Sequence, residues 1–271
     1  MIVAMKLSIV LSTHAARFEA VTFKGDFEAN VARIAEYGYD GVELAIRDPQ
    51  LVDGAQLEAS VGRYGLAVPA VGTGQAWGEE RLSFTAADAT VRRAAVERVK
   101  SHIPLARRLG AVIILGLIRG ITPAGQSHAQ SMDYLVAALQ ECTGAAQKEG
   151  VRFALEPLNR YETDLIHTVD EAMELIGRVG APNLGLLLDT FHMNIEEPVI
   201  EDSIRVAGDR IFHFHVADSN RWYPGAGHLD FVTILGALRE TGYTGWVSGE
   251  FMPLPDVDTA ARRGLETMRA V

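Results

Sequence analysis

The segment LLLDTFHMNIEE, Leu186–Glu197, runs from an unbroken aliphatic stretch into Asp189 and places His192 three positions further on. Consecutive leucines without alternating polar residues are typical of a strand that is buried on both faces. An acid at the end of such a strand is expected where the strand leaves the core and reaches a functional edge. The segment therefore predicts a buried parallel strand with chemistry at its carboxyl end.

Seven other segments share this continuous apolar character. Together they predict eight strands, at residues 6–12, 41–46, 67–73, 112–118, 153–157, 184–190, 211–218 and 246–251. Segments of helical periodicity alternate with them, at residues 27–38, 55–65, 87–110, 131–150, 168–180, 200–207 and 231–242, with a last one from residue 257. Eight strand and helix pairs predict an α/β fold, a single (β/α)₈ TIM barrel over residues 1–271, rather than a doubly wound sheet.

The composition limits the classes of protein and partner. The 271 residues are 48% hydrophobic and 22% charged, which is ordinary for a globular protein with a large core. A net charge of -10 disfavours nucleic acid and anionic membrane as partners. The N-terminal run MIVAMKLSIVLSTH is too short for a membrane span and lacks a signal cleavage site, and the single cysteine, Cys142, has no partner for an internal disulfide. We therefore expect a cytoplasmic protein.

Polar side chains gather at the predicted carboxyl ends of the strands, where barrels of this type place their chemistry. The set consists of Glu43, Arg47, Arg119, Glu156, Asp189, His192, His213, His215 and Glu250. Because strand side chains alternate with a period of two, Glu156 is expected on the face of Ala154. Similarly, Asp189 shares the face of Leu187, and Glu250 that of Ser248. His213 and His215 share one face, which predicts that Phe212 and Phe214 point the other way and pack under helices.

If the acids face inward, four adjacent strands bring Glu156, Asp189, His215 and Glu250 to one point. Three carboxylates left together in a low-dielectric mouth would repel one another strongly, and a divalent cation removes that conflict. Three oxygen donors and one imidazole suit Mn²⁺, Co²⁺, Mg²⁺ or Zn²⁺. The alternative is a set of hydrogen-bonded barrel residues without an ion, in which Asp189 caps a helix and His192 lies at the surface.

Several motifs resemble the D-tagatose 3-epimerase and D-allulose 3-epimerase family of ketose epimerases, within the xylose-isomerase-like TIM barrels. In the second half of the chain they are LEPLNRYE, LLLDTFHMNIEE, FHFHVADSNRWYPGAGHLDF and GEF. The first half is similar to the branch that includes 5-keto-L-gluconate epimerase, through KLSIVLSTH, GYDGVELAIRDP, VGTGQAWG and GLIRG. The resemblance implies a metal-dependent epimerase acting on a ketose or keto-sugar acid, and homo-oligomers, dimers or tetramers, are expected for such barrels.

The resemblance also implies roles for individual residues. It assigns the metal to Glu156, Asp189, His215 and Glu250, and the substrate to Glu162, His192 and Arg221. A metal that holds the carbonyl oxygen and a neighbouring hydroxyl oxygen would acidify the hydrogen between them by stabilising an enediolate. Inversion needs an acid–base group on each face of the carbon, and the two metal-bound glutamates are the expected pair.

Three other functions use the same residues. The first is an isomerase similar to hydroxypyruvate isomerase, or an inosose-type dehydratase, and either enzyme would use the same metal site. An endonuclease IV-like hydrolase would need more metals, more histidines and a positive surface, which the charge of -10 disfavours. A non-catalytic sugar-binding barrel would not need a second glutamate on the metal.

The glycine-rich segment VGTGQAWG does not predict a nucleotide cofactor. Trp77 occupies the place of the third glycine of a dinucleotide fingerprint, and no strand follows at the right interval. The indole of Trp77 is instead a candidate lid over the apolar face of a sugar, or a residue that packs at the rim.

Arg47 and Arg119 follow predicted strands and are candidates to bind the carboxylate of a keto-sugar acid. The alternative is that they pair with local acids such as Asp48 and Glu43. We expect Arg47→Ala to remove most of the turnover of an acidic sugar and little of that of a neutral ketose, compared as kcat on both substrates. Equal losses on the two substrates would exclude this role.

Overall fold

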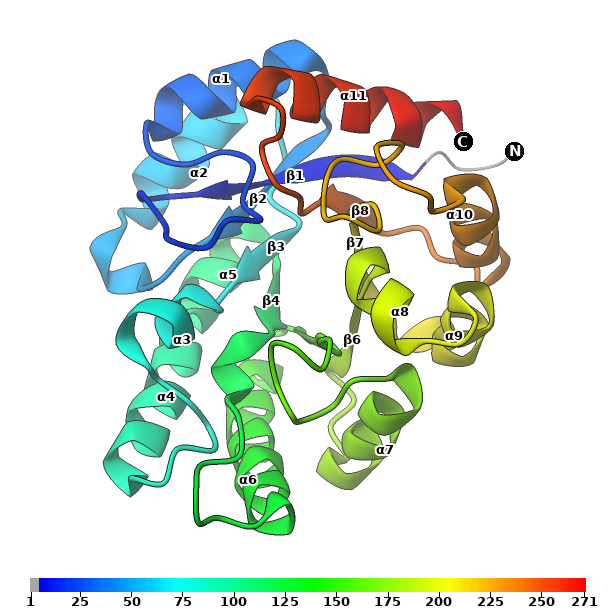
Figure 1. Ribbon diagram of the computed structural model, residues 1–271. Helices are drawn as coiled ribbons and strands as arrows, with labels where there is room; N and C mark the ends of the chain where they lie inside the picture. Colours follow the sequence, from blue (N-terminus) through cyan, green and yellow to red (C-terminus); the bar gives the residue numbers. More distant parts are fainter. Residues whose placement is uncertain (1–4) are drawn as a thin grey trace.

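The apolar segments of the sequence form eight parallel strands that close into a barrel in the computed structural model, which describes residues 5–271 (Figure 1). The first four residues of the N-terminal run discussed above lie outside this range. The strands are β1 (Lys6–Ser12), β2 (Gly41–Ala45), β3 (Ala70–Gly72), β4 (Val112–Leu115), β5 (Phe153–Leu155), β6 (Leu184–Asp189), β7 (Ile211–Val216) and β8 (Trp246–Gly249). Each strand pairs with its neighbours in the chain, and β1 also pairs with β8, which closes the barrel. The predicted (β/α)₈ barrel is confirmed.

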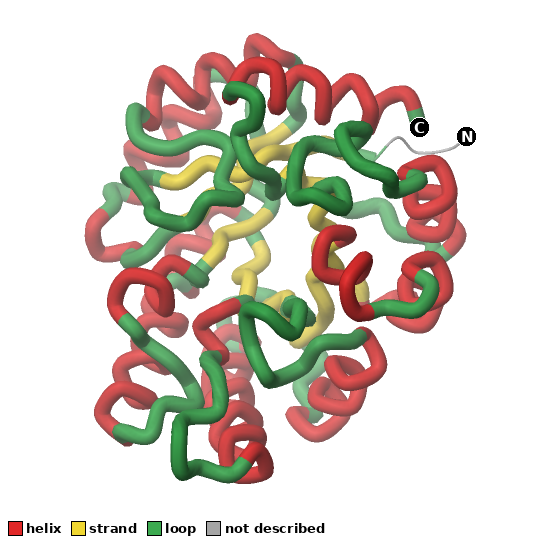
Figure 2. The backbone as a smooth tube through the Cα atoms, in the orientation of Figure 1, coloured by secondary structure: helices red, strands yellow, loops and turns green. Residues whose placement is uncertain are grey.

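Helices surround the barrel (Figure 2). They are α1 (Phe27–Tyr37), α2 (Gly54–Arg63), α3 (Gln75–Glu80), α4 (Ala89–Ser101), α5 (Ile103–Leu109), α6 (His128–Gln147), α7 (Val169–Val179), α8 (Thr190–Glu196), α9 (Ile200–Ala207), α10 (Phe231–Glu240) and α11 (Val257–Ala270). Short 3₁₀ turns occur at η1 (Pro49–Leu51), η2 (Leu117–Arg119) and η3 (Gly208–Arg210). The helix predicted over residues 87–110 is two helices, because Pro104 begins a new one in its first turn. Helices α3 and α8 had not been predicted.

Local sequence sets the ends of several helices. Asp26, Asp53 and Asp88 cap the first turns of α1, α2 and α4 by accepting backbone N–H groups. Thr168 and Glu171 form a reciprocal capping box at α7. Glycines with positive φ follow the ends of six helices, at positions 38, 65, 110, 150, 180 and 242. Short-range chemistry therefore determines where these helices begin and end.

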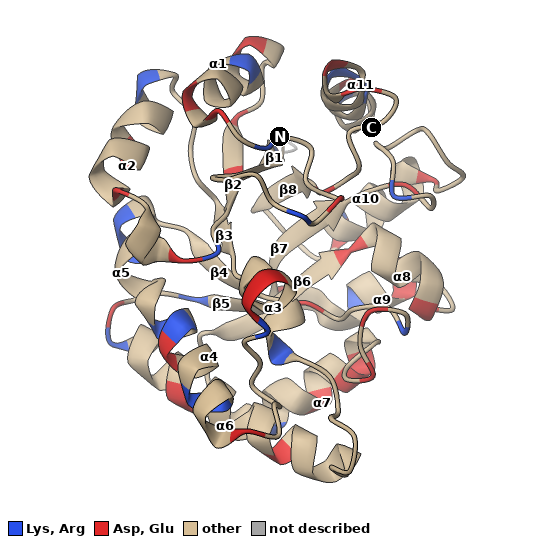
Figure 3. Ribbon diagram, turned by 60° about the vertical axis from the view of Figure 1, so that its left-hand side comes forward, with Lys and Arg blue, Asp and Glu red and all other residues tan. Residues whose placement is uncertain are grey.

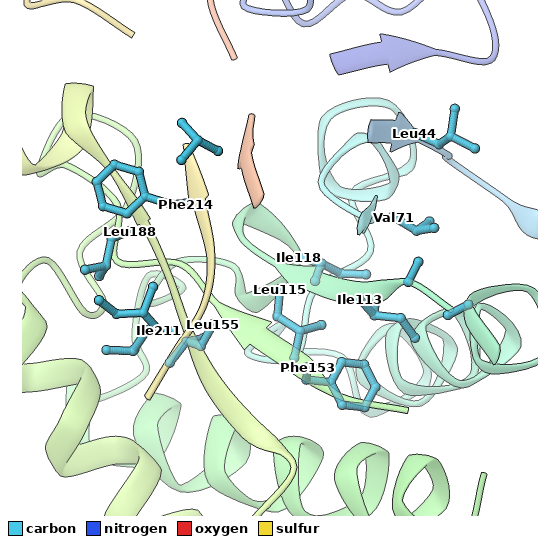
Figure 4. Close-up of a cluster of buried hydrophobic side chains, with 14 of the residues drawn as sticks. Leu44, Val71, Ile113, Leu115, Ile118, Phe153, Leu155, Leu188, Ile211 and Phe214 are labelled. Atoms are coloured by element: carbon cyan, nitrogen blue, oxygen red, sulfur yellow. The ribbon is translucent and has the colours of Figure 1, made fainter. Parts of the chain in front are cut away.

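Two apolar clusters alternate across the strands. The larger cluster fills the space between the barrel and the helices, and Figure 4 shows members from β2, β5 and β7, namely Leu44, Phe153 and Phe214. The smaller cluster consists of Ala70, Val112, Ile114, Ala154 and Leu187. Its members are the alternate residues of the same strands, so they face the barrel interior. Glu156 and Asp189 follow the inner residues by two positions, as the period predicts.

Phe212 corrects one prediction. It was expected to pack under the helices with Phe214, but its ring packs against the inner cluster. The register between β6 and β7 shifts between Leu186 and Leu187, since Leu186 pairs with Ile211 and Leu187 with His213. This bulge inserts one residue into β7 and breaks the period of two at Phe212. Beyond it the alternation resumes, and both histidines of β7 face the interior.

The outer helices carry mixed charge (Figure 3). Arg93 of α4, for example, forms ion pairs with Glu97 in the next turn and with Glu141 of α6. Such exposed pairs contribute little stability individually, in the range of about 0–1 kcal/mol, so the apolar clusters hold the fold together. Among residues 5–271, no helix combines the length and apolar character that crossing a membrane requires.

Candidate active site

A cavity of about 270 Å³ opens at the carboxyl ends of the strands. Its lining residues come from β1, β2, β3, β4 and β7 and from segments that follow the strands, including the loop after β1. The side chains that bring chemistry to it are Arg17, Glu43, Gln75, Glu79, Glu156, Glu162, His192, His215, Arg221 and Glu250. Apolar walls come from Val10, Phe18, Val21, Ala45, Ile114, Leu117 and Leu158. An enclosure of this kind, mostly apolar with convergent polar groups, is typical of a small-molecule site.

Four residues converge as the sequence predicts, and three of them, Glu156, His215 and Glu250, line this cavity. Glu156, Asp189, His215 and Glu250 each offer a ligand atom, and these atoms lie within 4.8 Å of one another. The first three side chains are buried, and Glu250 is half-buried. Three carboxylates and one imidazole within this distance form a candidate site for a divalent metal ion.

The electrostatics of the cluster fit a cation. Burial raises the pKa of Glu156 well above its usual range, and the charge of Glu250 raises it further. Burial likewise raises the pKa of Asp189, and it raises that of Glu250 to about 7. Within residues 5–271, Glu156 Oε1, Asp189 Oδ2 and His215 Nδ1 are buried without a hydrogen-bond partner. Buried polar atoms are normally paired, so these three converging atoms fit a metal ion that would be their common partner.

Glu156 gains its place from Gly116. The glutamate follows β5, and its backbone N–H continues the pairing by donating to the carbonyl of Leu115 at 3.2 Å. Gly116 then leaves room for the carboxylate, since a Cβ at that position would lie 2.6 Å from Glu156 Oε2. The missing side chain at position 116 is therefore what allows Glu156 to reach the cluster.

Asp189 has two roles at once. Its Oδ1 accepts the backbone N–H of Phe191 at 2.9 Å and caps α8, while Oδ2 remains free for the cluster. The two interpretations of this residue, metal ligand and helix cap, are thus compatible in one side chain. The surface histidine of the second interpretation is wrong, because His192 is 1% exposed.

His192 presents a hydrogen-bond donor to the site. The backbone N–H of Asn159 donates to its Nδ1 at 3.2 Å, so the ring hydrogen must be on Nε2. Nε2 lies 3.8 Å from Glu156 Oε1 and 3.7 Å from Asp189 Oδ2, with no hydrogen bond of its own. Burial lowers the pKa of His192 well below its usual value. His192 is therefore a neutral imidazole whose N–H is available to an oxygen of a bound molecule.

His215 uses its two nitrogens differently. Nδ1 faces the cluster, 3.9 Å from both Glu156 Oε1 and Glu250 Oε2. Nε2 contacts the carboxylate of Glu43 at 2.9 and 3.0 Å. Burial opposes the charged imidazolium, but the carboxylates of Glu43, Glu250 and Glu156 raise the pKa of His215 to about 10.

Arg221 lies between the cluster and the loops. It donates from one terminal nitrogen to Glu162 Oε1 and from the other to Glu250 Oε2, both at 2.9 Å. Its guanidinium lies 4.5 Å from the ring centre of Phe191 and 5.3 Å from that of Phe18. Arg221 is 9% exposed, so its donors are directed into the site rather than into solvent.

The loop of Arg221 is held by a buried aspartate. Asp218 accepts the backbone N–H groups of Ser219, Gly225 and Leu229 at 2.8 to 3.2 Å. Burial alone would raise its pKa, but these N–H groups lower it. The resulting turn holds Arg221 in a left-handed backbone conformation with φ of 61°. Such a conformation costs roughly 1–3 kcal/mol in a non-glycine residue and persists only where the surroundings enforce it.

Of the residues predicted to bind the substrate, three do not line the cavity. Arg47 pairs with Glu79 at 2.9 Å and with Glu80 at 3.3 Å, rather than with Asp48 or Glu43, the acids suggested by the sequence. Arg119 is fully buried and donates to backbone carbonyls of Gly116, Leu165 and Ile166. Trp77 stacks near the guanidinium of Arg81. Arg47 reaches the cavity only through Glu79, which lines it.

Two parts of the site were not predicted from the sequence. Glu43 was recognised as a strand residue, but its partners on β7 were not predicted; an acid within the apolar strand GVELA was the available signal. Arg17 and Phe18, in the loop after β1, also line the cavity. No periodicity or motif distinguishes that loop from an ordinary connection.

Comparisons with known proteins agree with this geometry. The family model for the xylose isomerase-like TIM barrel matches residues 31–271. An L-ribulose 3-epimerase from Methylomonas sp. (strain DH-1) is 32% identical over 248 residues, covering 88% of this chain and 85% of the relative. An L-ribulose 3-epimerase from Mesorhizobium japonicum is 33% identical over 254 residues, covering 92% and 83%. The crystal structure of D-allulose 3-epimerase from Methylomonas sp. in complex with D-allulose has a TM-score of 0.84 and 27% identity, covering 98% of this chain and 97% of that one.

The substitution Gly116→Ala tests the metal cluster. The added Cβ displaces only the end of the Glu156 side chain, so we expect roughly tenfold weaker Mn²⁺ binding with little change in thermal stability. Calorimetric titration with Mn²⁺ measures the affinity. Gly78→Ala is the matched control, because Gly78 also lines the cavity and its added Cβ meets nothing within 4 Å. Equal affinities in both variants would contradict the placement of Glu156.

Metal affinity should depend on pH. The raised pKa values of Glu250 and His215 mean that the metal-free protein retains protons that a cation has to displace. We therefore expect Mn²⁺ affinity to increase from about pH 6 to about pH 8, by up to about tenfold per pH unit for each proton released. Titration followed by the electron paramagnetic resonance of free Mn²⁺ measures this dependence. A constant affinity over the range would exclude proton competition at the cluster.

Proposed function

Because the chain belongs to the ketose 3-epimerase family of xylose isomerase-like TIM barrels, we propose that it inverts the carbon next to the keto group of a ketose in a reaction that depends on a divalent metal ion. An enzyme of this class is a carbohydrate isomerase. The observation that carries the proposal is the convergence of Glu156, Asp189, His215 and Glu250 at the cavity. Both glutamates belong to this cluster, as an inversion that uses two acid–base groups requires.

The metal ion would be held by the four residues of the cluster. When bound, it would supply positive charge that stabilises negative charge developing on the substrate's oxygens. The donor set favours Mn²⁺ or Co²⁺, with Mg²⁺ and Zn²⁺ as further candidates. The proposed reaction uses no nucleotide cofactor.

Glu156 and Glu250 would exchange protons with the substrate. They follow β5 and β8, which are separated in the barrel by β6 and β7, so their carboxylates enter the cavity from different strands. One removes a proton from the carbon, and the other returns a proton to the opposite face. The direction of the reaction decides which glutamate acts first as the base.

Three further residues would hold the substrate. The neutral His192 donates from Nε2 to an oxygen near the cluster. Arg221 offers a second, charged donor and also orients Glu250 through their 2.9 Å hydrogen bond. Glu162, which accepts from the other terminal nitrogen of Arg221, would accept a hydrogen bond from a sugar hydroxyl. Together they would place the carbon–hydrogen bond between the two glutamates.

Assembly and substrate charge form part of the same proposal. Exposed Val199, Val206 and Val232 lie on or next to α9 and α10, which supports a homo-oligomer, a dimer or tetramer, built through this face. Arg47, Arg119 and Trp77 are proposed to act on the substrate through the residues that line the cavity, and the ion pair of Arg47 with Glu79 supports this for Arg47. A keto-sugar acid is the second candidate substrate class.

An isomerase or dehydratase acting on the same metal is the alternative reaction, and the epimerase names of the similar proteins do not favour it. The hydrolase alternative requires a nucleic acid partner, which the net charge of -10 disfavours.

Hydrogen exchange tests the proposal directly. The Mn²⁺-loaded protein in D₂O should introduce deuterium at the carbon next to the keto group of L-ribulose or D-allulose, with the epimer appearing in parallel, as followed by NMR. Chelation of the metal should abolish both signals. The same measurement on 5-keto-L-gluconate tests the acidic-sugar alternative, and on hydroxypyruvate it tests the isomerase alternative. Bound metal without exchange in any ketose would overturn the epimerase proposal.

A further inference from the structure

A second cluster of titratable groups shares His215 with the metal site, and its other two members, Glu43 and His213, have no role in the reaction described above. Glu43 of β2 contacts His213 Nε2 at 2.7 Å, and it contacts His215 Nε2 at 2.9 and 3.0 Å. The three side chains are 1–2% exposed. They join β2 to β7 across the barrel interior, over a sequence separation of 170 residues or more.

We propose that Glu43 is a positioning residue that keeps the hydrogen of His215 on Nε2 and thereby leaves Nδ1 free to bind the divalent metal ion. The proposal rests on the proposed function only in taking His215 as a ligand. It adds a determinant of metal affinity that lies outside the set of four ligands.

The hydrogen-bonding capacity of a carboxylate supports this assignment. An ionised carboxylate can only accept, so both histidines must donate from Nε2 to Glu43. A neutral imidazole carries one ring hydrogen, and a hydrogen held on Nε2 leaves a lone pair on Nδ1. Nδ1 of His215 is the nitrogen that faces Glu156 and Glu250. A carboxylate that accepts from a ligand histidine in this way also fixes the orientation of the ring.

His213 helps to hold the carboxylate itself. Its Nε2 contacts Oε2 of Glu43, the same oxygen that His215 contacts at 2.9 Å. The ring centres of the two histidines lie 5.2 Å apart in an edge-on arrangement. With two donors converging on it, Glu43 cannot rotate away from His215 without leaving a buried N–H unpaired, which would cost roughly 1–3 kcal/mol.

The distances argue against a second metal ion in this cluster. Glu43, His213 and His215 have the residue types of a metal site. Ligand atoms around a tetrahedral ion with bonds of about 2.1 Å lie about 3.4 Å apart. The nitrogen-to-oxygen distances of 2.7 to 3.0 Å are instead those of direct N–H···O hydrogen bonds. The cluster is therefore better explained as an acceptor with two donors.

The test compares Glu43→Gln with Glu79→Gln. His215 Nε2 contacts both carboxylate oxygens of Glu43, so a glutamine amide in either orientation places its NH₂ group next to a nitrogen that has to remain a donor, which favours the other tautomer of His215. We expect roughly 10- to 100-fold weaker Mn²⁺ binding by calorimetry. Glu79 is the matched control, since it lines the same cavity but contacts Arg47 and His14 rather than a ligand. Its substitution should change Mn²⁺ affinity by no more than about twofold.

A spectroscopic measurement on the unaltered protein keeps the proposal falsifiable if Glu43→Gln does not fold. With ¹⁵N-labelled histidine and Zn²⁺ as the ion, NMR should show Nε2 of His215 bearing a hydrogen and Nδ1 bound to the metal, at one ion per chain. Metal on Nε2, two ions per chain, or unchanged affinity in Glu43→Gln would overturn the proposal. Failure of the epimerase proposal is distinguishable: the tautomer and stoichiometry would be as expected, but no ketose would exchange hydrogen.

Discussion

The arrangement of the barrel mouth depends on one constraint, the burial of several like charges next to one another. Glu156, Asp189 and Glu250 converge with His215 within 4.8 Å. An uncompensated buried ion costs several kcal/mol, and the mutual repulsion of the carboxylates adds to that cost. Positive charge from Arg221 offsets part of it, and a bound divalent ion would offset the rest. The same concentration of negative charge that is unfavourable in the empty site provides the affinity for a cation.

The surrounding structure maintains these donors in place. Each donor depends on a residue outside the cluster: Asp189 caps α8, Glu156 uses the space left by Gly116, His215 contacts Glu43, and Glu250 accepts from Arg221. The aspartate of the next loop, Asp218, plays the equivalent part for Arg221. For Asp189 and His215 the contact uses a different atom from the one that faces the cluster, so we expect little rearrangement when a cation binds.

The metal cluster and the substrate-binding residues lie on different parts of the barrel. The cluster residues lie within β6 and β7 or directly after β5 and β8, in or next to the hydrogen-bonded barrel. Glu162, His192 and Arg221 lie on the segments that follow those strands. Arg221 donates a hydrogen bond to Glu250 and another to Glu162, and His192 Nε2 lies 3.8 Å from Glu156 Oε1. Because the metal cluster lies on the strands and the substrate-binding residues on the segments that follow, changes in those segments can alter the sugar that is accepted without changing the metal chemistry.

The sequence by itself determined the eight strands, because strands buried on both faces are continuously apolar, and it determined the convergence of the four cluster residues, because parallel strands share one carboxyl edge and alternate with a period of two. Helices α3 and α8 were not predicted from the sequence, because each is too short to show a clear helical period. Only the tertiary structure decided the partner of Glu43, which lies across the barrel on β7. It alone placed Phe212 inside, through a bulge that depends on the pairing of two strands. It also decided that Arg47 is paired with Glu79 and that Arg119 is buried, because ion pairing and burial depend on segments distant in the sequence.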